Sequence, residues 1–275
     1  MDIASLQHIA TKIRIHIIDM LERAGSGHPG GSLSAADIMT ALYFGGILKH
    51  NPKDPQDDTR DRFVLSKGHA APVLYAVLAE SGYFPVEELS TLRAYKSRLQ
   101  GHPDSLKLPG VEISTGSLGQ GLSISSGIAS ALRLQGNDAH VFTLLGDGEL
   151  QEGQVWEAAL FAAHQGLDHL VAIVDNNHLQ IDGNVSDVCD IDDVAEKFKA
   201  FGWDVFSCDG NNMGEVYKTL IQARDTHNGK PKVVVAQTIK GKGVSFMQDN
   251  AGWHGKAPNA QEASRAREEL LAQEA

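Results

Sequence analysis

The chain has 275 residues, 42% hydrophobic and 21% charged, which is the composition of an ordinary globular protein with one large or two small domains. Its 24 Lys and Arg against 35 Asp and Glu give a net charge of −11, and the two signs are interleaved. This pattern argues against nucleic acid or an anionic membrane as a partner. No apolar run is long enough to span a membrane. Two cysteines, Cys189 and Cys208, form no disulfide framework, which favours a reducing, cytoplasmic location.

The expected elements alternate between helices and short buried strands. The N-terminal segment has helical spacing of apolar residues, at Leu6, Ile9, Ile13, Ile17 and Met20. Further helical patterns lie at 35–44, 70–81, 119–134, 155–164 and 213–226, and apolar or β-branched runs lie at 140–145, 170–175, 203–208 and 232–239. This alternation predicts an α/β fold, a mostly parallel sheet with helices on both faces. With no linker visible, residues 1–275 are expected to form a single domain, and the charged tail, 261–275, a solvated helix.

Glycine is enriched, with 28 residues in 275, and the glycines gather in clusters. The clusters lie at 25–31, 66–70, 100–104, 114–121, 146–153 and 252–255, and four of them include a histidine. A single cluster is usually a plain turn. Six of them indicate places where the backbone turns sharply or a ligand approaches it closely.

Two polar segments follow neighbouring strand candidates. Gly146-Asp147-Gly148 comes directly after the run at 140–145, and Asn176-Asn177 follows the run at 170–175. A right-handed crossover brings both strand ends to one edge of the sheet, and adjacent strands lie only ~4.8 Å apart. Asp147 and Asn177 are therefore expected to face one small ion at the edge where α/β proteins bind ligands.

The donor types at this edge favour magnesium. A carboxylate, an amide oxygen and the backbone carbonyl of Leu179 are hard oxygen donors, and Mg²⁺ fills its other positions with water and phosphate oxygens. Ca²⁺ and Mn²⁺ are alternatives. Gly146 and Gly148 would let a phosphate approach the main chain. The simpler alternative is an N-capping Asp and a turn Asn-Asn, which the complete strand–helix–strand unit makes less favourable.

The GDG and NN motifs together are typical of thiamine-diphosphate-dependent enzymes, and the sequence resembles the N-terminal half of transketolase from about residue 25 to 258. The segments that carry the resemblance occur in the family's order: SGHPGG, FVLSKGHA, GHPD, LPGVEISTGSLGQGL, GDGELQEG, NNHLQIDG and WHG. The resemblance implies a thiamine-diphosphate-binding fold and the diphosphate-binding domain within it.

The resemblance also implies roles for individual residues. Asp147, Asn177 and the Leu179 carbonyl would hold the metal ion. The cofactor-binding set would be His69, Gly116, Leu118, Gly146, Asp147, Gly148, Glu152, Asn177 and His254. The catalytic set, His28, His69 and His102, would orient and protonate sugar oxygens, since imidazoles both polarise oxygens and carry protons near neutral pH. Other histidines match no motif and are left as structural or surface residues: His8, His16, His50, His140, His164, His169, His178 and His227.

Four further charged residues keep two interpretations each. Glu152 and Glu157 either stabilise a helix N-terminus or, as the resemblance implies, join a carboxylate network between paired active sites. Lys240 and Lys242 either reach an anion or lie solvated in a Lys-Gly turn.

The resemblance covers only part of a transketolase. The family activates the cofactor with a glutamate in a pyrimidine-binding domain, and this chain ends at Ala275 without that domain. We therefore expect a split transketolase in which a separately encoded C-terminal subunit completes an α₂β₂ assembly. It would cleave a ketose phosphate between C2 and C3 and transfer the two-carbon ketol unit to an aldose, as in the pentose phosphate pathway.

Four alternatives stay open at this point. They are a transketolase specialised for unusual sugars, a 1-deoxyxylulose-5-phosphate synthase-like enzyme, the α subunit of a 2-oxo acid dehydrogenase, and a non-catalytic cofactor-binding or scaffolding subunit.

Overall fold

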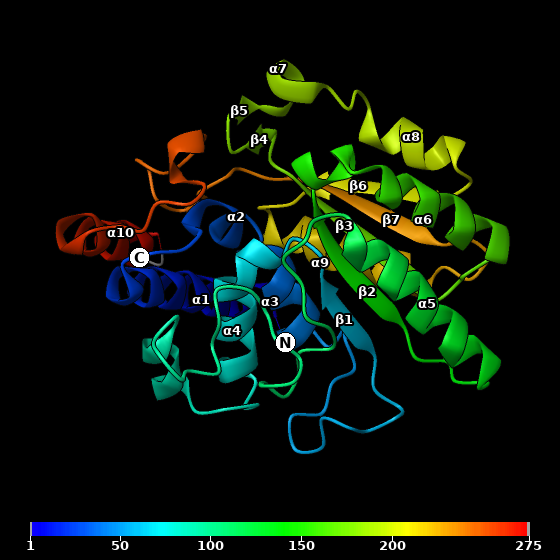
Figure 1. Ribbon diagram of the computed structural model, residues 1–275, viewed down its shortest axis with the longest axis horizontal. Helices are drawn as coiled ribbons and strands as arrows, with labels where there is room; N and C mark the ends of the chain where they lie inside the picture. The colour runs from blue at the N-terminus through cyan, green and yellow to red at the C-terminus, as the bar shows by residue number, and fades with distance from the viewer. Residues whose placement is uncertain (1, 274–275) are drawn as a thin grey trace.

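The computed structural model describes residues 2–273, and its centre is a five-stranded parallel sheet (Figure 1). The strands lie in the order β1 (Arg62–Leu65), β2 (Val141–Gly146), β3 (Leu170–Asn176), β7 (Lys232–Gln237) and β6 (Asp204–Asp209). Every neighbouring pair is parallel. The predicted parallel sheet with helices on both faces is therefore confirmed.

The strands read as continuous apolar runs because both faces of the sheet are covered. In β2, Phe142 and Leu144 belong to one core, whereas Val141 and Leu145 belong to the other. The same alternation continues in β3 and β7. Two hydrophobic cores therefore share one sheet as their common wall.

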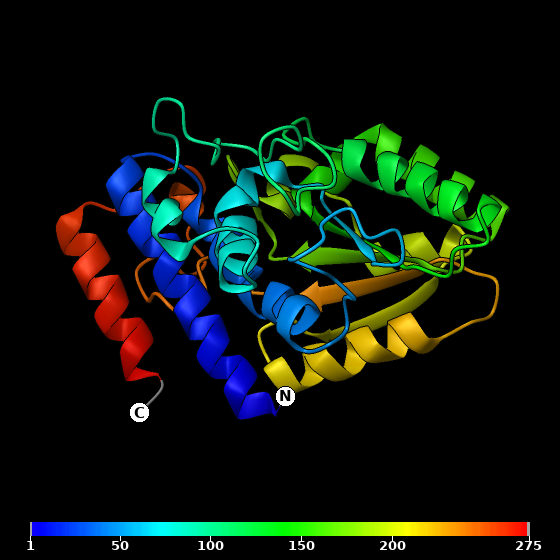
Figure 2. The same cartoon turned by 90° about the horizontal axis from the view of Figure 1, so that it is seen from below.

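Long helices build the layer on the first face (Figure 2). They are α1 (Ile3–Ala24), α3 (Ala36–Phe44), α4 (Ala71–Glu80), α9 (Met213–Asp225) and α10 (Ala260–Ala272). Helix α1 packs against α3, α4 and α10, and α3 packs against α9. The second face is covered by α5 (Gln120–Leu134), α6 (Gly153–Gln165) and α8 (Val194–Ala200).

Short elements surround the carboxyl edge of the sheet. They are α2 (Pro29–Ser34), the 3₁₀ turns η1 (Gly68–Ala70), η3 (Gly148–Gln151) and η4 (Ala251–Trp253), the strands β4 (Leu179–Gln180) and β5 (Gly183–Asn184), and α7 (Val185–Cys189). The 3₁₀ turn η2 (Val86–Thr91) packs instead against α1 and α4. Strands β4 and β5 form a separate antiparallel hairpin. Most of the glycine and histidine clusters lie in these connections.

Two details differ from the sequence-based expectations. Strand β1 was not predicted, because its four residues begin with Arg62 and are too short to show a pattern. The tail does form a helix, α10, capped by Asn259 and Glu262 in a capping box. It is not fully solvated, however: Ala266 and Leu270 are buried against the core, and Arg267 pairs with acidic residues of α1.

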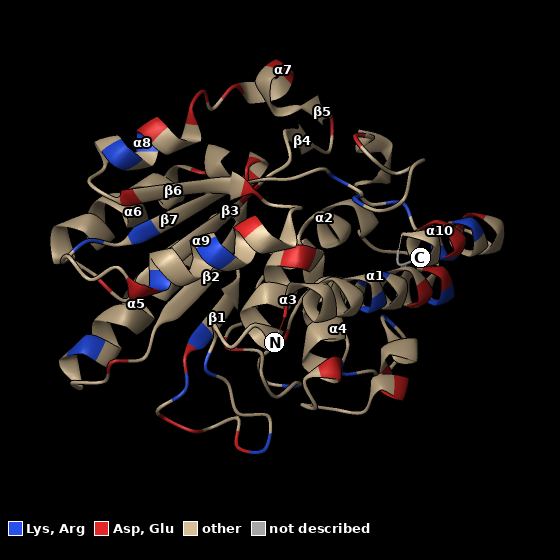
Figure 3. Cartoon of the chain, turned by 180° about the vertical axis from the view of Figure 1, so that it is seen from behind, with Lys and Arg blue, Asp and Glu red and all other residues tan. Residues whose placement is uncertain are grey.

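Charged residues of both signs occur together on the outer helices. In Figure 3, α8 and α10 each carry acidic and basic positions. Among residues 2–273, no helix combines the length and the apolarity that a bilayer crossing requires. Both cysteines are free, Cys189 exposed and Cys208 buried.

Candidate functional site

Asp147 and Asn177 lie side by side at the carboxyl edge of the sheet, as their positions after two strands predicted. Strands β2 and β3 are neighbours, with Gly146 paired to Asp175, and the Asp147 backbone N–H donates to the Asp175 carbonyl at 3.3 Å. Both Asp147 and Asn177 are buried. The crossover argument therefore placed these two side chains correctly.

The loop after β3 wraps around the Asp147 carboxylate. Gly148 N–H donates to one carboxylate oxygen at 2.8 Å, and His178 N–H donates to the other. His178 takes a left-handed conformation, φ 62°, which turns the chain so that its N–H points at Asp147. Burial, with the nearby Asp175 charge, nevertheless raises the pKa of Asp147 to about 6. A bound cation would relieve this unfavourable negative charge.

The backbone carbonyl of Leu179 faces the same space and accepts a hydrogen bond from Lys240. The Lys240 Nζ lies 2.8 Å from this oxygen and 2.9 Å from Nδ1 of His254. Burial, followed by the neighbouring Lys67 charge, lowers the pKa of Lys240 to about 8. The alternative of a solvated Lys240 is therefore wrong, since only 2% of the residue is exposed. Lys242, two residues later, lines a different cavity.

A buried charge pair, Lys67 with Asp175, lies directly behind the site. Lys67 Nζ contacts Asp175, whose carboxylate also accepts from Ser34 Oγ at 2.6 Å and from Thr238. Burial raises the pKa of Asp175, but Lys67 and the two hydroxyl donors outweigh it, so the net pKa lies below the usual value. The sequence motif included Lys67, but nothing in the sequence connected it to Asp175.

Glu149 fixes the loops on either side of Asp147, and sequence reasoning missed it. Its carboxylate accepts from Ser66 Oγ, from Gly119 N–H at 2.9 Å and from Gly146 N–H at 3.0 Å. It is buried, and burial raises its pKa. One acidic side chain therefore joins the ends of β1 and β2 to the start of α5.

Four histidines, one from each of the four histidine-bearing glycine clusters, meet above the Asp147 region. The ring centroid of His28 lies 5.4 Å from that of His69, 6.3 Å from His102 and 5.5 Å from His254. The rings of His69 and His254 stack at 5.0 Å. The three histidines predicted as catalytic therefore share one location with His254.

Burial and neighbouring cations keep these imidazoles neutral. Burial, followed by the Arg93 charge, lowers the pKa of His28 to about 4. Burial and Lys240 lower that of His254 to about 3, and burial and Lys67 lower that of His69 well below its usual value. Because the imidazoles are neutral, Lys67 and Lys240 are the cationic side chains of the cleft lining, and the ring nitrogens are able to donate or accept hydrogen bonds.

Two glycines at the cleft, Gly148 and Gly116, leave little room for a side chain. A Cβ on Gly148 would lie 3.1 Å from the Gln180 side chain, and one on Gly116, at φ 148°, would lie 3.1 Å from the His102 ring. Leu118 and Glu152 also line the cleft, and Gly116 lies next to His102.

Glu152 and Glu157 are both exposed at the start of α6 and make no network within this chain's described residues.

The resulting cavity has a volume of about 240 Å³ and fits an anionic ligand held with a divalent cation. Three buried polar atoms on the segments around it, His28 Nδ1, Thr115 Oγ1 and Gln180 Nε2, have no hydrogen-bond partner among the described residues. Buried polar groups are normally paired. With the Asp147, Asn177 and Leu179 oxygens and the Lys67 and Lys240 ammonium groups, they match a magnesium diphosphate better than an apolar ligand.

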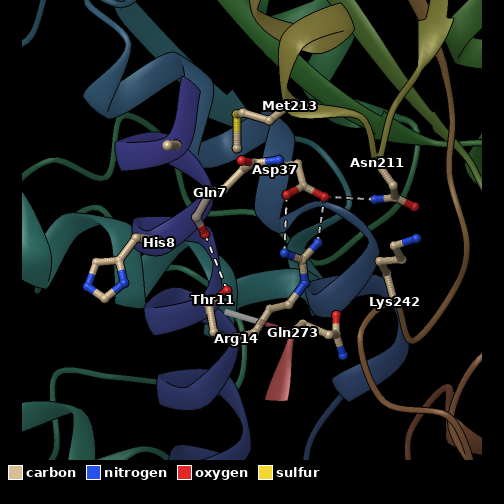
Figure 4. Close-up of a pocket in the computed structure, with 10 residues that line it drawn as sticks. Gln7, His8, Thr11, Arg14, Asp37, Asn211, Met213, Lys242 and Gln273 are labelled. Atoms are coloured by element: carbon tan, nitrogen blue, oxygen red, sulfur yellow. Dashed lines mark hydrogen bonds and ion pairs between the residues drawn. The ribbon is translucent and has the colours of Figure 1, made fainter. Parts of the chain in front are cut away.

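A separate cavity of about 360 Å³ lies between α1, α3 and the turn before α9 (Figure 4). Arg14 and Asp37 form a two-point ion pair there, with Nη1–Oδ1 at 3.1 Å and Nη2–Oδ2 at 2.5 Å. Asn211 donates to the same carboxylate at 3.0 Å. Arg14 and Asp37 thus pair with each other, while the buried Arg14 Nε has no hydrogen-bond partner among the described residues. The cavity lining includes Lys242 but none of the residues predicted to bind metal or cofactor or to act in catalysis.

Comparisons with known proteins agree with the geometry of the cleft. The family profile described as "Transketolase, thiamine diphosphate binding domain" matches residues 5–274. The chain is 44% identical, over 90% of each protein, to the 6-deoxy-6-sulfo-D-fructose transketolase subunit of Clostridium sp. (strain MSTE9). It is 43% identical to an apulose-4-phosphate transketolase subunit of Actinobacillus succinogenes, covering 95% of this chain and 93% of that one.

Full-length relatives match over the same region. The crystal structure of Campylobacter jejuni transketolase superposes with a TM-score of 0.91 and 38% identity, covering 98% of this chain. This chain spans 43% of that structure and 42% of human transketolase, with which it is 40% identical. The assignment to the N-terminal, diphosphate-binding part of a transketolase is confirmed. The chain belongs to the transketolase family of thiamine-diphosphate-dependent transferases.

Proposed function

We propose that the chain is the diphosphate- and metal-binding subunit of a two-subunit transketolase. The observation that carries the proposal is the buried cleft in which the oxygens of Asp147, Asn177 and Leu179 lie beside two lysines and four neutral histidines. The chain also matches nearly the full length of relatives that are named as transketolase subunits, which supports the same proposal. Two cores built on one sheet support a single domain over residues 1–275.

In this proposal Asp147, Asn177 and the Leu179 carbonyl hold Mg²⁺, with Ca²⁺ or Mn²⁺ as substitutes. Lys240 now donates to the Leu179 carbonyl, so it must turn toward a diphosphate oxygen when the ion binds that carbonyl. Gly148 N–H, His69 and His254 would donate to the same diphosphate. Gly116 and Leu118 would contact the cofactor through their main chain.

Thiamine diphosphate supplies the nucleophilic carbon and the electron sink that ketol transfer needs. The chain's own contribution to the reaction is made by His28, His69 and His102. The ring centroids of His69 and His102 lie 5.4 and 6.3 Å from that of His28. Each neutral ring can accept a hydrogen bond from a sugar hydroxyl at one nitrogen and donate one to a sugar oxygen from the other, which orients the donor sugar. A ketose donor would be cleaved between C2 and C3, and an aldose would accept the two-carbon unit.

A partner subunit is proposed from the exposed surface beside the cleft as well as from the relatives. Helix α6 starts with the exposed Glu152 and Glu157 and continues with Leu160 and Phe161, which are 60% and 45% exposed. Large apolar side chains beside uncompensated acids are typical of a surface that another chain covers. We propose an α₂β₂ assembly, located in the cytoplasm, in which these acids meet their counterparts.

A specialised sugar is the second candidate for the substrate. The relatives of matching length are named for 6-deoxy-6-sulfo-D-fructose and for apulose 4-phosphate. We therefore propose that the donor is either a common ketose phosphate or a ketose with an unusual carbon skeleton or terminal anion.

Calorimetric titration tests the cofactor site, and a ketol-transfer assay tests the reaction. Thiamine diphosphate with Mg²⁺ is titrated into the chain alone and into the chain with its candidate partner, and Asp147→Asn is the control in both. The assay uses xylulose 5-phosphate and ribose 5-phosphate, followed by a panel of unusual ketoses. We expect binding that depends on Asp147, and turnover only when the partner is present. Turnover by the isolated chain would overturn the two-subunit proposal.

A further inference from the structure

A second cluster of histidines lies at the opposite end of the sheet. His140 and His169 directly precede β2 and β3, and the register pairs the residues that follow them, Val141 with Leu170. Their rings stack with centroids 4.7 Å apart and planes at 14°. His227, from the connection between α9 and β7, lies 5.3 Å from the His169 centroid and 5.9 Å from that of His140.

We propose that His140, His169 and His227 form a binding site for a transition-metal ion of the Zn²⁺ class. One ring nitrogen of each histidine lies within 4.8 Å of the other two. A tetrahedral ion with Zn–N bonds of ~2.0–2.1 Å holds its nitrogens ~3.3 Å apart, so the rings must close by at most about 1.5 Å. His227 can make this movement because it lies in a loop and its side chain is 51% exposed.

The surroundings of the cluster resemble those of metal-binding histidines. The Arg224 carbonyl lies 3.2 Å from Nε2 of His140, and a carboxylate oxygen of Asp168 lies 3.4 Å from Nδ1 of His227. Such acceptors fix one ring nitrogen and make the other a better ligand.

The charges around the cluster favour a cation. Asp61 lies 3.9 Å from Nδ1 of His140, and Asp168 faces His227. Asp168 also pairs with Lys232, and Arg224 pairs with Asp225, so Asp61 is the carboxylate beside the cluster that pairs with no lysine or arginine among the described residues.

The proposed site differs from the cofactor cleft in ligand type and position. Three imidazoles select Zn²⁺, Ni²⁺, Co²⁺ or Cu²⁺ over Mg²⁺, which prefers oxygen. Figure 2 shows the connection from α9 to β7 passing the end of the sheet at which β2 begins. An ion here would join that connection to β2 and β3, so its expected effect is on stability. Its fourth coordination position would be open to water.

Cobalt titration of the purified full-length chain tests the proposal. The protein carries no histidine tag and is stripped of metal, and Co²⁺ binding is followed by its visible ligand-field absorption, with Zn²⁺ as the displacing ion. We expect one tightly bound Co²⁺ per chain. Since losing even an outer-shell partner weakens metal sites ~10–100-fold, His169→Gln and His227→Gln should each bind more than ~10-fold more weakly.

Two control variants locate the ion. His164→Gln removes an exposed histidine outside the cluster, and His254→Gln alters the cofactor cleft; both should bind Co²⁺ as the wild type does. Zn²⁺ should also raise the Tm of the wild type more than that of His227→Gln. Wild-type affinity in His169→Gln and His227→Gln, or loss of binding in His254→Gln, would overturn the proposal.

Discussion

Two buried ion pairs, one in the helical layer and one behind the cofactor cleft, consist of similar groups but have different functions. Arg14 and Asp37 join α1 to α3, and each side chain is 8% exposed. Lys67 and Asp175 join the end of β1 to the end of β3, with side chains 2% and 0% exposed. Arg14 matches its carboxylate with a planar two-point fork, while Lys67 is a point charge with donors to spare.

The difference lies in what each cation faces besides its partner. Arg14 and Asp37 close on each other and on Asn211, so no net charge is offered to a ligand. Lys67 also donates to the Gly31 carbonyl at 2.8 Å and lowers the pKa values of His69 and Lys240 by its charge. The first pair is thus a structural connection, whereas the second also contributes positive potential to the cleft.

Lys67→Met should have the largest effect, because it damages both stability and binding. Breaking a buried pair leaves an uncompensated charge and costs about 3–5 kcal/mol, here on Asp175. The cleft also loses a cation facing the proposed diphosphate, so thiamine diphosphate affinity should fall. Urea denaturation and calorimetric titration measure the two effects. Unchanged affinity in a folded Lys67→Met protein would show that the pair is structural only.

Arg14→Met is the matched variant in the other pair. It should cost a similar stability, about 3–5 kcal/mol, since Asp37 is left buried with Asn211 as its remaining side-chain donor. Cofactor affinity of the folded fraction should stay within a factor of two of wild type, measured by the same titration. A large loss of affinity would mean that the two pairs are coupled through the helical layer.

Asp147→Asn should remove a pH-dependent loss of stability and should also weaken metal and cofactor binding. The folded pKa of Asp147 is raised from 3.8 to about 6, so the folded state binds more protons than the unfolded state between these values. Stability of the metal-free chain therefore falls as pH rises from about 4 to about 6. Without metal, Asp147→Asn should lack this slope, so the wild type should lose up to about 3 kcal/mol of stability relative to the variant as pH rises from 4 to 7.

Added Mg²⁺ and thiamine diphosphate should remove that loss in the wild type, because only the wild type keeps the carboxylate. Urea denaturation from pH 4 to 8, with and without the ligands, measures both effects. A metal-free wild type that loses no stability relative to Asp147→Asn as pH rises from 4 to 7 would contradict the raised pKa.

The sequence alone was sufficient where local patterns decide the structure. Four strands were found because they are buried on both faces and therefore uniformly apolar, and Asp147 and Asn177 met because parallel strands end at one edge. The helix α10 was found, but its charges concealed that Ala263, Ala266 and Leu270 repeat at helical spacing and face the core.

Long-range pairing of buried charges could not be predicted in the same way. Lys67 and Asp175 are 108 positions apart. For Lys240, the Lys-Gly turn predicts a solvated side chain, and only the structure shows that the residues at the η4 turn cover it. A single buried charge is strongly destabilising, whereas a buried charge that has its partners is tolerated. The burial of each of these charged side chains is therefore explained only when the position of its partner is known.

The smallest stability change is expected from replacing a whole pair with apolar groups. Buried ion pairs exchanged for well-packed apolar residues of similar volume are often neutral or stabilising, so Arg14→Met with Asp37→Leu should change the free energy of unfolding by no more than about 1 kcal/mol. Lys67→Met with Asp175→Leu should recover only part of the stability lost in Lys67→Met, because Ser34 and Thr238 lose the carboxylate that accepts their hydrogen bonds, and it should not recover cofactor affinity. Urea denaturation and calorimetric titration of the four variants give two matched comparisons of a single with a double variant. If the second double variant regained affinity, the charge of Lys67 would have no role in the cleft, and the contrast between the two pairs would reduce to packing.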